Sequence, residues 1–365
     1  MTIQLSGQAT DFPRTSGQTC WQSPANIALV KYWGKYPVQI PMNPSLSFVL
    51  KGSVVKICMD YSIDPDSPFE LVSFSLNGQV NDIFKSRIDN YLEGLVPFFP
   101  FLKHAQIHID SESSFPHSAG IASSAAAFSA LALCVCSIEA EISGKAPGTE
   151  AFLRRASFMA RLGSGSACRS IYDGMVLWGK TEQLPGSSDE YAVKLESRHV
   201  HRRFMKMKDA VLIVDSGTKK VSSSAGHALM HHHPYREQRK EQASANLGRL
   251  LNALQRGEMP LFGEIIEDEA LSLHSLMMSS SPGYILMHPN TIRLLEKIRE
   301  FRRETRAHAY FTLDAGPNIH LIYPESDAAQ VIPFIRDELT SLCRDGRWID
   351  DGMGTGPERI AHGSK

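Results

Sequence analysis

The chain has 365 residues, a length that favours two domains over a single compact core. Hydrophobic residues make up 42% and charged residues 21%, as in a soluble globular protein, so extensive disorder is excluded. The formal net charge of −1 argues against broad electrostatic attraction to nucleic acid or to a membrane surface, and we expect neither as a partner.

The N-terminal residues and the cysteines indicate where the protein works. The first residues form no apolar stretch and include Asp11 and Arg14, so we expect no secretory signal peptide there. We expect residues 1–18 to be a flexible arm. The six cysteines include no Cys-x-x-Cys pair, and a chain of this length does not depend on disulfide bonds, so we expect reduced thiols and a cytoplasmic location.

Residue patterns predict a strand-rich start to the chain. Residues 27–33 and 45–61 are rich in β-branched and aromatic residues, as strands are. A strand over 69–78 ends in Asn77-Gly78, a dipeptide typical of a hairpin turn. Apolar residues at helical spacing predict a helix over 83–99. The elements expected next are a strand over 105–113, an amphipathic helix over 149–161 and a strand over 172–178.

One apolar segment has the length of a membrane span. Residues 119–137 carry no charged side chain and are long enough to cross a bilayer. Several serines and runs of alanine favour instead a helix buried in a soluble protein, because nothing else in the chain resembles a membrane protein.

The second half of the chain begins a new pattern of strands and helices. A basic, polar segment over 198–208 precedes a strand over 209–216, so we place the domain boundary near residue 205. The N-terminal domain then covers 19–205 and the C-terminal domain covers 206–365. The C-terminal domain is expected to contain helices over 221–257, 260–274 and 289–305 and a strand pair over 307–324. Strands precede helices in blocks on both sides of the boundary, which predicts two α+β domains.

The stretch FPHSAGIASSAAA, residues 115–127, joins a predicted strand to the apolar helix. Its small side chains would let phosphate oxygens approach the backbone N–H groups at the helix start, where the helix dipole favours an anion. The alternative is a helix that packs tightly through a small face, and this stretch alone does not decide between the two. It matches neither of the two commonest glycine-rich nucleotide motifs.

Three further stretches combine reactive side chains with tight turns. SPANIALVKYWGK places Lys31 and Lys35 around an aromatic pair, and GSGSACRS combines glycines and hydroxyls with Arg169. TLDAGPN places Asp314 between a strand and a turn, a common position for a catalytic group. Each stretch alone is compatible with a capped turn, but the four together favour a catalytic site.

Five strings carry a family resemblance: NIALVKYWGK, FPHSAGIASSAAA, GSGSACRS, KKVSSSAG and DAGPN. On these, from Trp21 to Pro357, the chain resembles the mevalonate diphosphate decarboxylase family of the GHMP kinase superfamily. The resemblance implies an N-terminal domain like ribosomal protein S5 domain 2, a ferredoxin-like C-terminal domain and a homodimer. It also implies ATP- and Mg²⁺-dependent conversion of mevalonate 5-diphosphate into isopentenyl diphosphate, ADP, phosphate and CO₂, a lyase reaction of isoprenoid and lipid biosynthesis.

The resemblance further implies roles for individual residues. Asp314 would be the catalytic carboxylate, Arg169 would hold the substrate carboxylate, and Lys31 would act beside them. The remaining substrate-binding residues would be Tyr32, Lys35, Arg87, Ser164 and Ser166. Arg87 would bind the terminal phosphate of the substrate. The ATP-binding loop would comprise Ser118, Ala119, Gly120, Ile121, Ala122, Ser123 and Ser124, of which Ser124 is the candidate Mg²⁺ ligand.

The sequence departs from the family pattern near the substrate and nucleotide edges. The charged Arg-Asp pair that commonly follows KYWGK is replaced by uncharged residues, and the helix expected over 221–257 carries the histidine-rich run HALMHHHPYREQR. A decarboxylase of mevalonate 5-phosphate is therefore the nearest alternative, ahead of a mevalonate 3-kinase and of a non-catalytic nucleotide-binding member of the fold. We expect no metal site at His231–His233, because adjacent histidines on a helix point in different directions.

Overall fold

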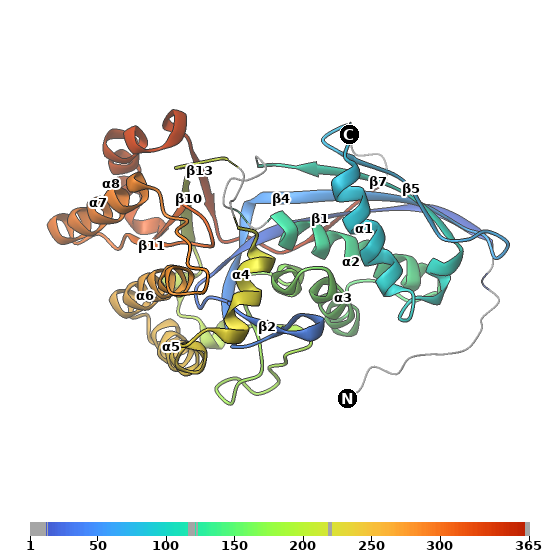
Figure 1. Cartoon of the computed structure of the whole chain (residues 1–365), viewed down its shortest axis with the longest axis horizontal. Coiled ribbons are helices and arrows are strands. Elements are labelled where there is room, and N and C mark those ends of the chain that lie inside the picture. Colours follow the sequence, from blue (N-terminus) through green and yellow to red (C-terminus); the bar gives the residue numbers. More distant parts are fainter. Residues whose placement is uncertain (1–11, 13, 116–120, 122, 218–220, 362–365) are drawn as a thin grey trace.

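The structure of the protein is a computed structural model, which describes residues 12, 14–115, 121, 123–217 and 221–361. It has two parts, each built on a mixed arrangement of sheet and helices (Figure 1). The prediction of two α+β domains is confirmed.

The larger part is an eight-stranded sheet whose main path is β14-β1-β4-β7-β5-β6, with β8 and β9 attached beside β4. The long central strand β4 pairs antiparallel with both β1 and β7. The strands of this sheet are β1 (Thr15–Ala28), β4 (Ser45–Ile63), β5 (Glu70–Leu76), β6 (Gln79–Val80), β7 (Ala105–Ser113), β8 (Met175–Trp178), β9 (Ala192–Lys194) and β14 (Glu358–Ile360). The Asn77-Gly78 turn joins β5 to β6 with positive φ at both residues, as predicted.

Helices cover one face of this sheet: α1 (Asp82–Leu95), α2 (Ser123–Ile142) and α3 (Glu150–Gly163) (Figure 1). Val55, Ile57 and Met59 of β4 are buried on that face and alternate with partly exposed residues. In the part of the chain that the structure describes, α2 alone is long and apolar enough to span a membrane, but 78% of its apolar window is buried inside the protein. The prediction of a buried core helix is confirmed.

The smaller part is a four-stranded sheet in the order β11-β12-β10-β13. Its strands are β10 (Met207–Leu212), β11 (Tyr310–Thr312), β12 (Ile319–Pro324) and β13 (Trp348–Gly352), and a separate two-stranded sheet is formed by β2 (Lys35–Tyr36) and β3 (Ile40–Pro41). The remaining helices are α4 (Ser223–Leu229), α5 (Arg236–Arg256), α6 (Met259–Met278), α7 (Pro289–Thr305) and α8 (Ala328–Phe334). The single helix expected over 221–257 is divided in two, because Pro234 lies between α4 and α5 and cannot continue a helix.

The expected domain limits are wrong at both ends. Strand β1 begins at Thr15 and pairs residues 15–18 with residues 60–63 of β4, so these residues belong to the sheet and not to an arm. Strand β14 returns to pair with β1, so the C-terminal residues 358–360 complete the N-terminal sheet. Asp351 also ties the two parts together, since its carboxylate accepts hydrogen bonds from the backbone N–H groups of Lys51, Gly52 and Ser53.

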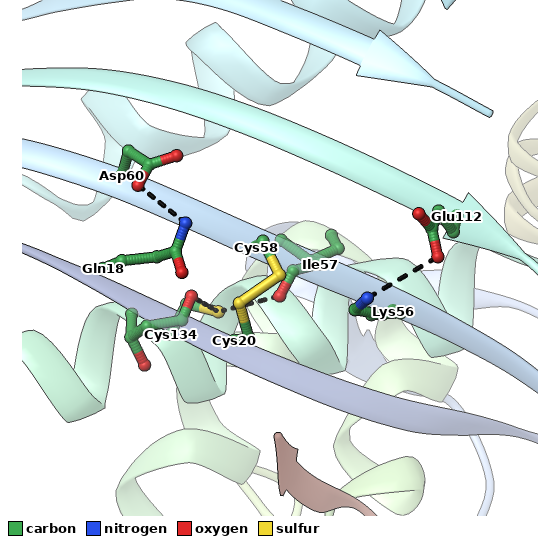
Figure 2. Close-up of a disulfide and its surroundings, with 9 residues drawn as sticks. Gln18, Cys20, Lys56, Ile57, Cys58, Asp60, Glu112 and Cys134 are labelled. Atoms are coloured by element: carbon green, nitrogen blue, oxygen red, sulfur yellow. Dashed lines mark hydrogen bonds and ion pairs between the residues drawn. A yellow bond between two sulfur atoms is a disulfide. The ribbon is translucent and has the colours of Figure 1, made fainter. Parts of the chain in front are cut away.

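The expectation that all cysteines are reduced is also wrong. Cys20 on β1 and Cys58 on β4 form a disulfide bond, with their Cα atoms 4.1 Å apart (Figure 2). The two residues lie directly opposite each other in the antiparallel pair, a register that a separation of 38 residues in the sequence does not reveal. The other four cysteines are free and buried.

Candidate active site

A cleft with a volume of about 530 Å³ is lined by residues of both parts of the molecule. The predicted residues that line it are Lys31, Tyr32, Lys35, Arg87, Ile121, Ser123, Ser124, Ser164, Ser166, Arg169 and Asp314. Ser118, Ala119, Gly120 and Ala122 lie outside the described residues. The structure therefore brings segments that are up to 283 residues apart in the chain into one site.

The centre of the cleft is an ion pair between Lys31 and Asp314. The Lys31 Nζ atom lies 2.9 Å from Asp314 Oδ1, and the Lys31 side chain is only 2% exposed while that of Asp314 is 28% exposed. Burial lowers the pKa of Lys31, and the neighbouring Asp314 opposes that change. The Lys31 amine is thus held in place beside Asp314, and the carboxylate is accessible from the cleft.

A second, fully buried ion pair holds the backbone of Lys31 from behind. Glu269 on α6 accepts a hydrogen bond from the Lys31 backbone N–H at 2.8 Å and two from Arg239 of α5 at 2.6 and 2.9 Å. Arg239 also donates to the Lys31 carbonyl at 3.0 Å, and Asn246 donates to Glu269 at 2.8 Å. We call Arg239, Asn246 and Glu269 the lysine clamp. It fixes the position from which the Lys31 side chain enters the cleft.

Arg169 is the other buried cation of the cleft, and it has no carboxylate within ion-pair distance among the described residues. Its Nε donates to Asn26 Oδ1 at 3.2 Å and its Nη1 to Ser45 Oγ at 2.5 Å. Burial lowers the pKa of Arg169, but a guanidinium remains charged at any physiological pH. A buried guanidinium held only by neutral partners is suited to receive an anionic group of a ligand.

Two further cations, Lys35 and Arg87, lie near each other in the wall of the cleft. Lys35 donates to the neutral side chain of Gln39 at 2.9 Å, and the Arg87 guanidinium lies 4.7 Å from the centre of the Phe128 ring. Partial burial and the nearby Arg87 lower the pKa of Lys35. In the described part of the chain neither cation forms an ion pair with a carboxylate, so the part of the cleft around them also favours an anion.

The serines at the start of α2 are suited to bind phosphate rather than to form a metal site made only of protein ligands. Ser123 and Ser124 line the cleft, and the Ser124 hydroxyl lies 3.3 Å from that of Ser164. No group of three or more His, Cys, Asp or Glu residues that could hold a metal ion occurs within the described ranges. A Mg²⁺ ion here would take most of its oxygen ligands from phosphates and water, as Mg²⁺ commonly does.

Sequence reasoning missed several residues of the site. Asn26 and Ser222–Ser224 lie inside strings that carried the resemblance but were given no role, whereas His227 was noted only as part of a histidine-rich run. No sequence motif indicated the members of the lysine clamp. Lys31 and Glu269 are 238 residues apart in the sequence, and only the fold brings them together. The Tyr32 hydroxyl was expected in the site, and it is buried without a hydrogen-bond partner among the described residues.

Comparison with known proteins identifies the family. Residues 23–192 match the diphosphomevalonate decarboxylase-like N-terminal domain, and residues 210–349 match the mevalonate 5-diphosphate decarboxylase C-terminal domain. The chain is also 30% identical over 332 residues to the diphosphomevalonate decarboxylase of Gibberella zeae, covering 85% of this chain and 82% of that protein. The chain belongs to the diphosphomevalonate decarboxylase family. It is therefore an enzyme with the GHMP-kinase type of two-domain fold, as the resemblance implied.

Solved structures show the same architecture. The mevalonate diphosphate decarboxylase of Staphylococcus aureus is similar with a TM-score of 0.80 and 28% identity, covering 95% of this chain and 99% of that one. A structure described as MDDEF in complex with MVAPP, AMPPCP and magnesium has a TM-score of 0.79 and 24% identity, with 95% and 99% coverage, and supports the fold.

Proposed function

We propose that the cleft catalyses the ATP-dependent decarboxylation of mevalonate 5-diphosphate to isopentenyl diphosphate. The observation that carries the proposal is the Lys31–Asp314 pair at 2.9 Å in the same cleft as the buried Arg169, in a chain of the diphosphomevalonate decarboxylase family. The structure described above with MVAPP and AMPPCP gives independent support, since that relative binds the corresponding substrate and nucleotide analogue.

Asp314 acts on the 3-hydroxyl of the substrate. This hydroxyl is tertiary and a poor leaving group, so it must first receive the terminal phosphoryl group of ATP. A carboxylate beside it orients the oxygen and accepts its proton as the oxygen attacks phosphorus. Lys31, fixed by the lysine clamp 2.9 Å from Asp314, keeps that carboxylate in position and adds positive charge where negative charge collects.

Arg169 controls the second step. Departure of the 3-phosphate leaves positive charge on the tertiary carbon, and cleavage of the bond to the carboxylate supplies the electron pair that forms the alkene and releases CO₂. A planar guanidinium can hold the carboxylate through two parallel hydrogen bonds, which aligns the breaking bond with the leaving phosphate. Asn26 and Ser45 orient the guanidinium for this task.

ATP and Mg²⁺ are the cofactors that the site would hold. Ser123 and Ser124 at the start of α2 would contact the ATP phosphates, with Ser124 as the candidate Mg²⁺ ligand, and bound Mg²⁺ would supply charge neutralisation for the transferring phosphoryl group. Ser164 and Ser166 would contact the substrate, Tyr32 would line its site, and Lys35 and Arg87 would bind its diphosphate. The homodimer remains a proposal from the family resemblance. The cytoplasmic location remains a proposal of the sequence analysis, and the Cys20–Cys58 bond overturns one part of its argument, that all six thiols are reduced.

The test of this function measures ADP and CO₂ release side by side with mevalonate, mevalonate 5-phosphate and mevalonate 5-diphosphate. We expect equal amounts of ADP and CO₂, with the 5-diphosphate as the preferred substrate by kcat/KM. Preference for the 5-phosphate would identify the neighbouring decarboxylase activity, and ADP release without CO₂ would identify a 3-kinase. Absence of ADP release with all three compounds would refute the proposed function.

A further inference from the structure

His227 of α4 enters the cleft between two aromatic rings of the other part of the molecule. The centre of its imidazole lies 4.4 Å from that of the Tyr32 ring and 4.6 Å from that of the Trp33 ring. The residue is only 7% exposed, yet it lines the cleft together with Lys35, Arg87 and Ser223. The imidazole is therefore held rigidly at the wall of the substrate site.

One hydrogen bond fixes which nitrogen of His227 carries the proton. The backbone N–H of Gly34 donates to His227 Nδ1 at 2.9 Å, so Nδ1 must be unprotonated to accept it. A neutral imidazole then carries its single proton on Nε2. Burial, reinforced by the nearby Lys35, lowers the pKa of His227 to about 3, so this neutral form with a proton on Nε2 persists across the physiological range.

The Nε2–H donor has no hydrogen-bond partner within the described residues, and it is not one of the side-chain atoms closed off from solvent, as befits a residue that lines the cleft. A rigidly held donor that opens into a binding cleft and has no protein partner is available to a ligand atom. The neighbouring cations Lys35 and Arg87 form no ion pair with a carboxylate in the described part of the chain, so the ligand in this part of the cleft is an anion. The complementary atom for Nε2–H is an anionic oxygen.

We propose that His227 is a substrate-binding residue that donates its Nε2–H to a phosphate oxygen of the substrate's 5-diphosphate. This inference rests on the proposed function, because that function supplies the diphosphate. Lys35 and Arg87 neutralise the charge of the diphosphate, and a neutral donor held between two rings fixes its orientation without adding a third charge. The Gly34 backbone, in the left-handed region at φ +89, places the N–H donor whose hydrogen bond to Nδ1 keeps the imidazole in this orientation.

Two variants separate this role from a purely structural one. In His227→Gln the amide nitrogen can occupy the position of Nε2 and keep the donor, whereas the acceptor for Gly34 is lost. In His227→Asn the amide oxygen can occupy the position of Nδ1 and keep the bond from Gly34, whereas the donor into the cleft is lost. Thermal melting of both variants checks that each is folded.

The proposal predicts a rise in KM for mevalonate 5-diphosphate of about tenfold or more in His227→Asn, the loss expected for a hydrogen bond to a charged group. His227→Gln should stay within about threefold of the wild type in KM, and kcat should change little in either variant. Unchanged KM in His227→Asn, or an equal rise in both variants, would overturn the proposal. Turnover of the 5-diphosphate by the wild type is measured first, so a failure of the proposed function is distinguished from a failure of this inference.

A measurement on the wild-type enzyme tests the same contact without relying on the fold of a variant. The ¹⁵N-histidine NMR spectrum, with His227 assigned by its absence in His227→Gln, reports the exchange of the Nε2 proton with water. We expect slower exchange on addition of mevalonate 5-diphosphate and no change on addition of mevalonate. An Nε2 proton that does not respond to the 5-diphosphate would contradict the proposed contact.

Discussion

The two sides of Lys31 show opposite solutions to the burial of charge. Behind it, the carboxylate of the lysine clamp has its partners within the protein: Glu269 is fully buried and accepts hydrogen bonds from Arg239, Asn246 and the Lys31 backbone. In front of it, Asp314 is 28% exposed and reaches the cleft, and the buried Arg169 has only neutral hydrogen-bond partners. The protein pairs the clamp charges in its interior, whereas on the cleft side it leaves the Arg169 guanidinium with neutral partners that a ligand anion can complement.

This difference separates stability from catalysis. A buried charge whose partners are all within the protein contributes to the folded state, and removal of one partner leaves the other uncompensated. A charge that lacks a protein partner costs stability in the free enzyme and is compensated when substrate binds. Substitutions in the clamp should therefore affect unfolding, whereas substitutions in the cleft should affect turnover or substrate binding.

The largest expected effect is on turnover in Asp314→Asn, which keeps the shape of the side chain and removes its charge and basicity. We expect kcat to fall by about 10²–10⁴-fold, the range for loss of a positioned general base. ADP and CO₂ release should fall together, because no 3-phosphate would form to be decarboxylated. The substitution also leaves the 2% exposed Lys31 side chain without its carboxylate partner, so a thermal melting curve checks that the variant is folded at the assay temperature. A paired ADP and CO₂ assay measures the loss, and turnover within threefold of the wild type would falsify the role of Asp314.

Glu269→Ala tests the other side of the comparison, the contribution of the lysine clamp to the stability of the folded protein. It leaves the Arg239 guanidinium buried at 2% side-chain exposure without its carboxylate, so we expect the free energy of unfolding to fall by about 3–5 kcal/mol. The matched control is Glu264→Ala on the same helix, which breaks an exposed pair with Arg249 and should cost about 0–1 kcal/mol. Urea denaturation of both variants measures the difference. Equal losses would show that the clamp contributes no more than a surface pair.

Arg87→Ala tests whether the cations of the cleft distinguish one ligand from another. If Arg87 binds the terminal phosphate, KM for mevalonate 5-diphosphate should rise by about tenfold or more, because a charge-assisted contact is lost. The rise should be much smaller for mevalonate 5-phosphate, which lacks that phosphate. Steady-state kinetics with both substrates measure the ratio. The same rise with both would mean that Arg87 does not recognise the terminal phosphate.

The sequence predicted the cleft side of Lys31 better than the clamp side. Lys31, Arg169 and Asp314 lie in short strings of unusual composition, so local chemistry singled them out. Arg239 and Glu269 lie in ordinary amphipathic helices, where a charged residue normally indicates a solvent-exposed face. Local sequence patterns also could not predict the Cys20–Cys58 bond or the pairing of β14 with β1, because both depend on the register of strands that are distant in the sequence.

The smallest expected effect concerns His274, which connects the two sides. It lies on α6, the helix of Glu269, and its Nε2–H donates to the Asp314 carbonyl at 3.1 Å. Burial lowers the pKa of His274 from the ordinary value of 6.5 to about 4, an effect that Lys31 reinforces and the Asp314 side chain and carbonyl oppose. The His274 side chain therefore binds a proton at a higher pH in the unfolded chain than in the folded protein. The contribution of neutral His274 to the free energy of unfolding is fully present above pH 6.5 and is lost as the pH falls toward 4.

His274→Gln isolates this contribution, because a glutamine amide can keep the donor to the Asp314 carbonyl but does not titrate. Between pH 6.5 and 4.5 we expect the free energy of unfolding of the wild type to fall more steeply than that of the variant, by up to about 1.4 kcal/mol per pH unit. Other titrating groups, including the buried His227, are common to both proteins and cancel in the difference. Urea denaturation at intervals across this range measures the two slopes. Parallel curves would show that His274 is protonated as readily in the folded protein as in the unfolded chain.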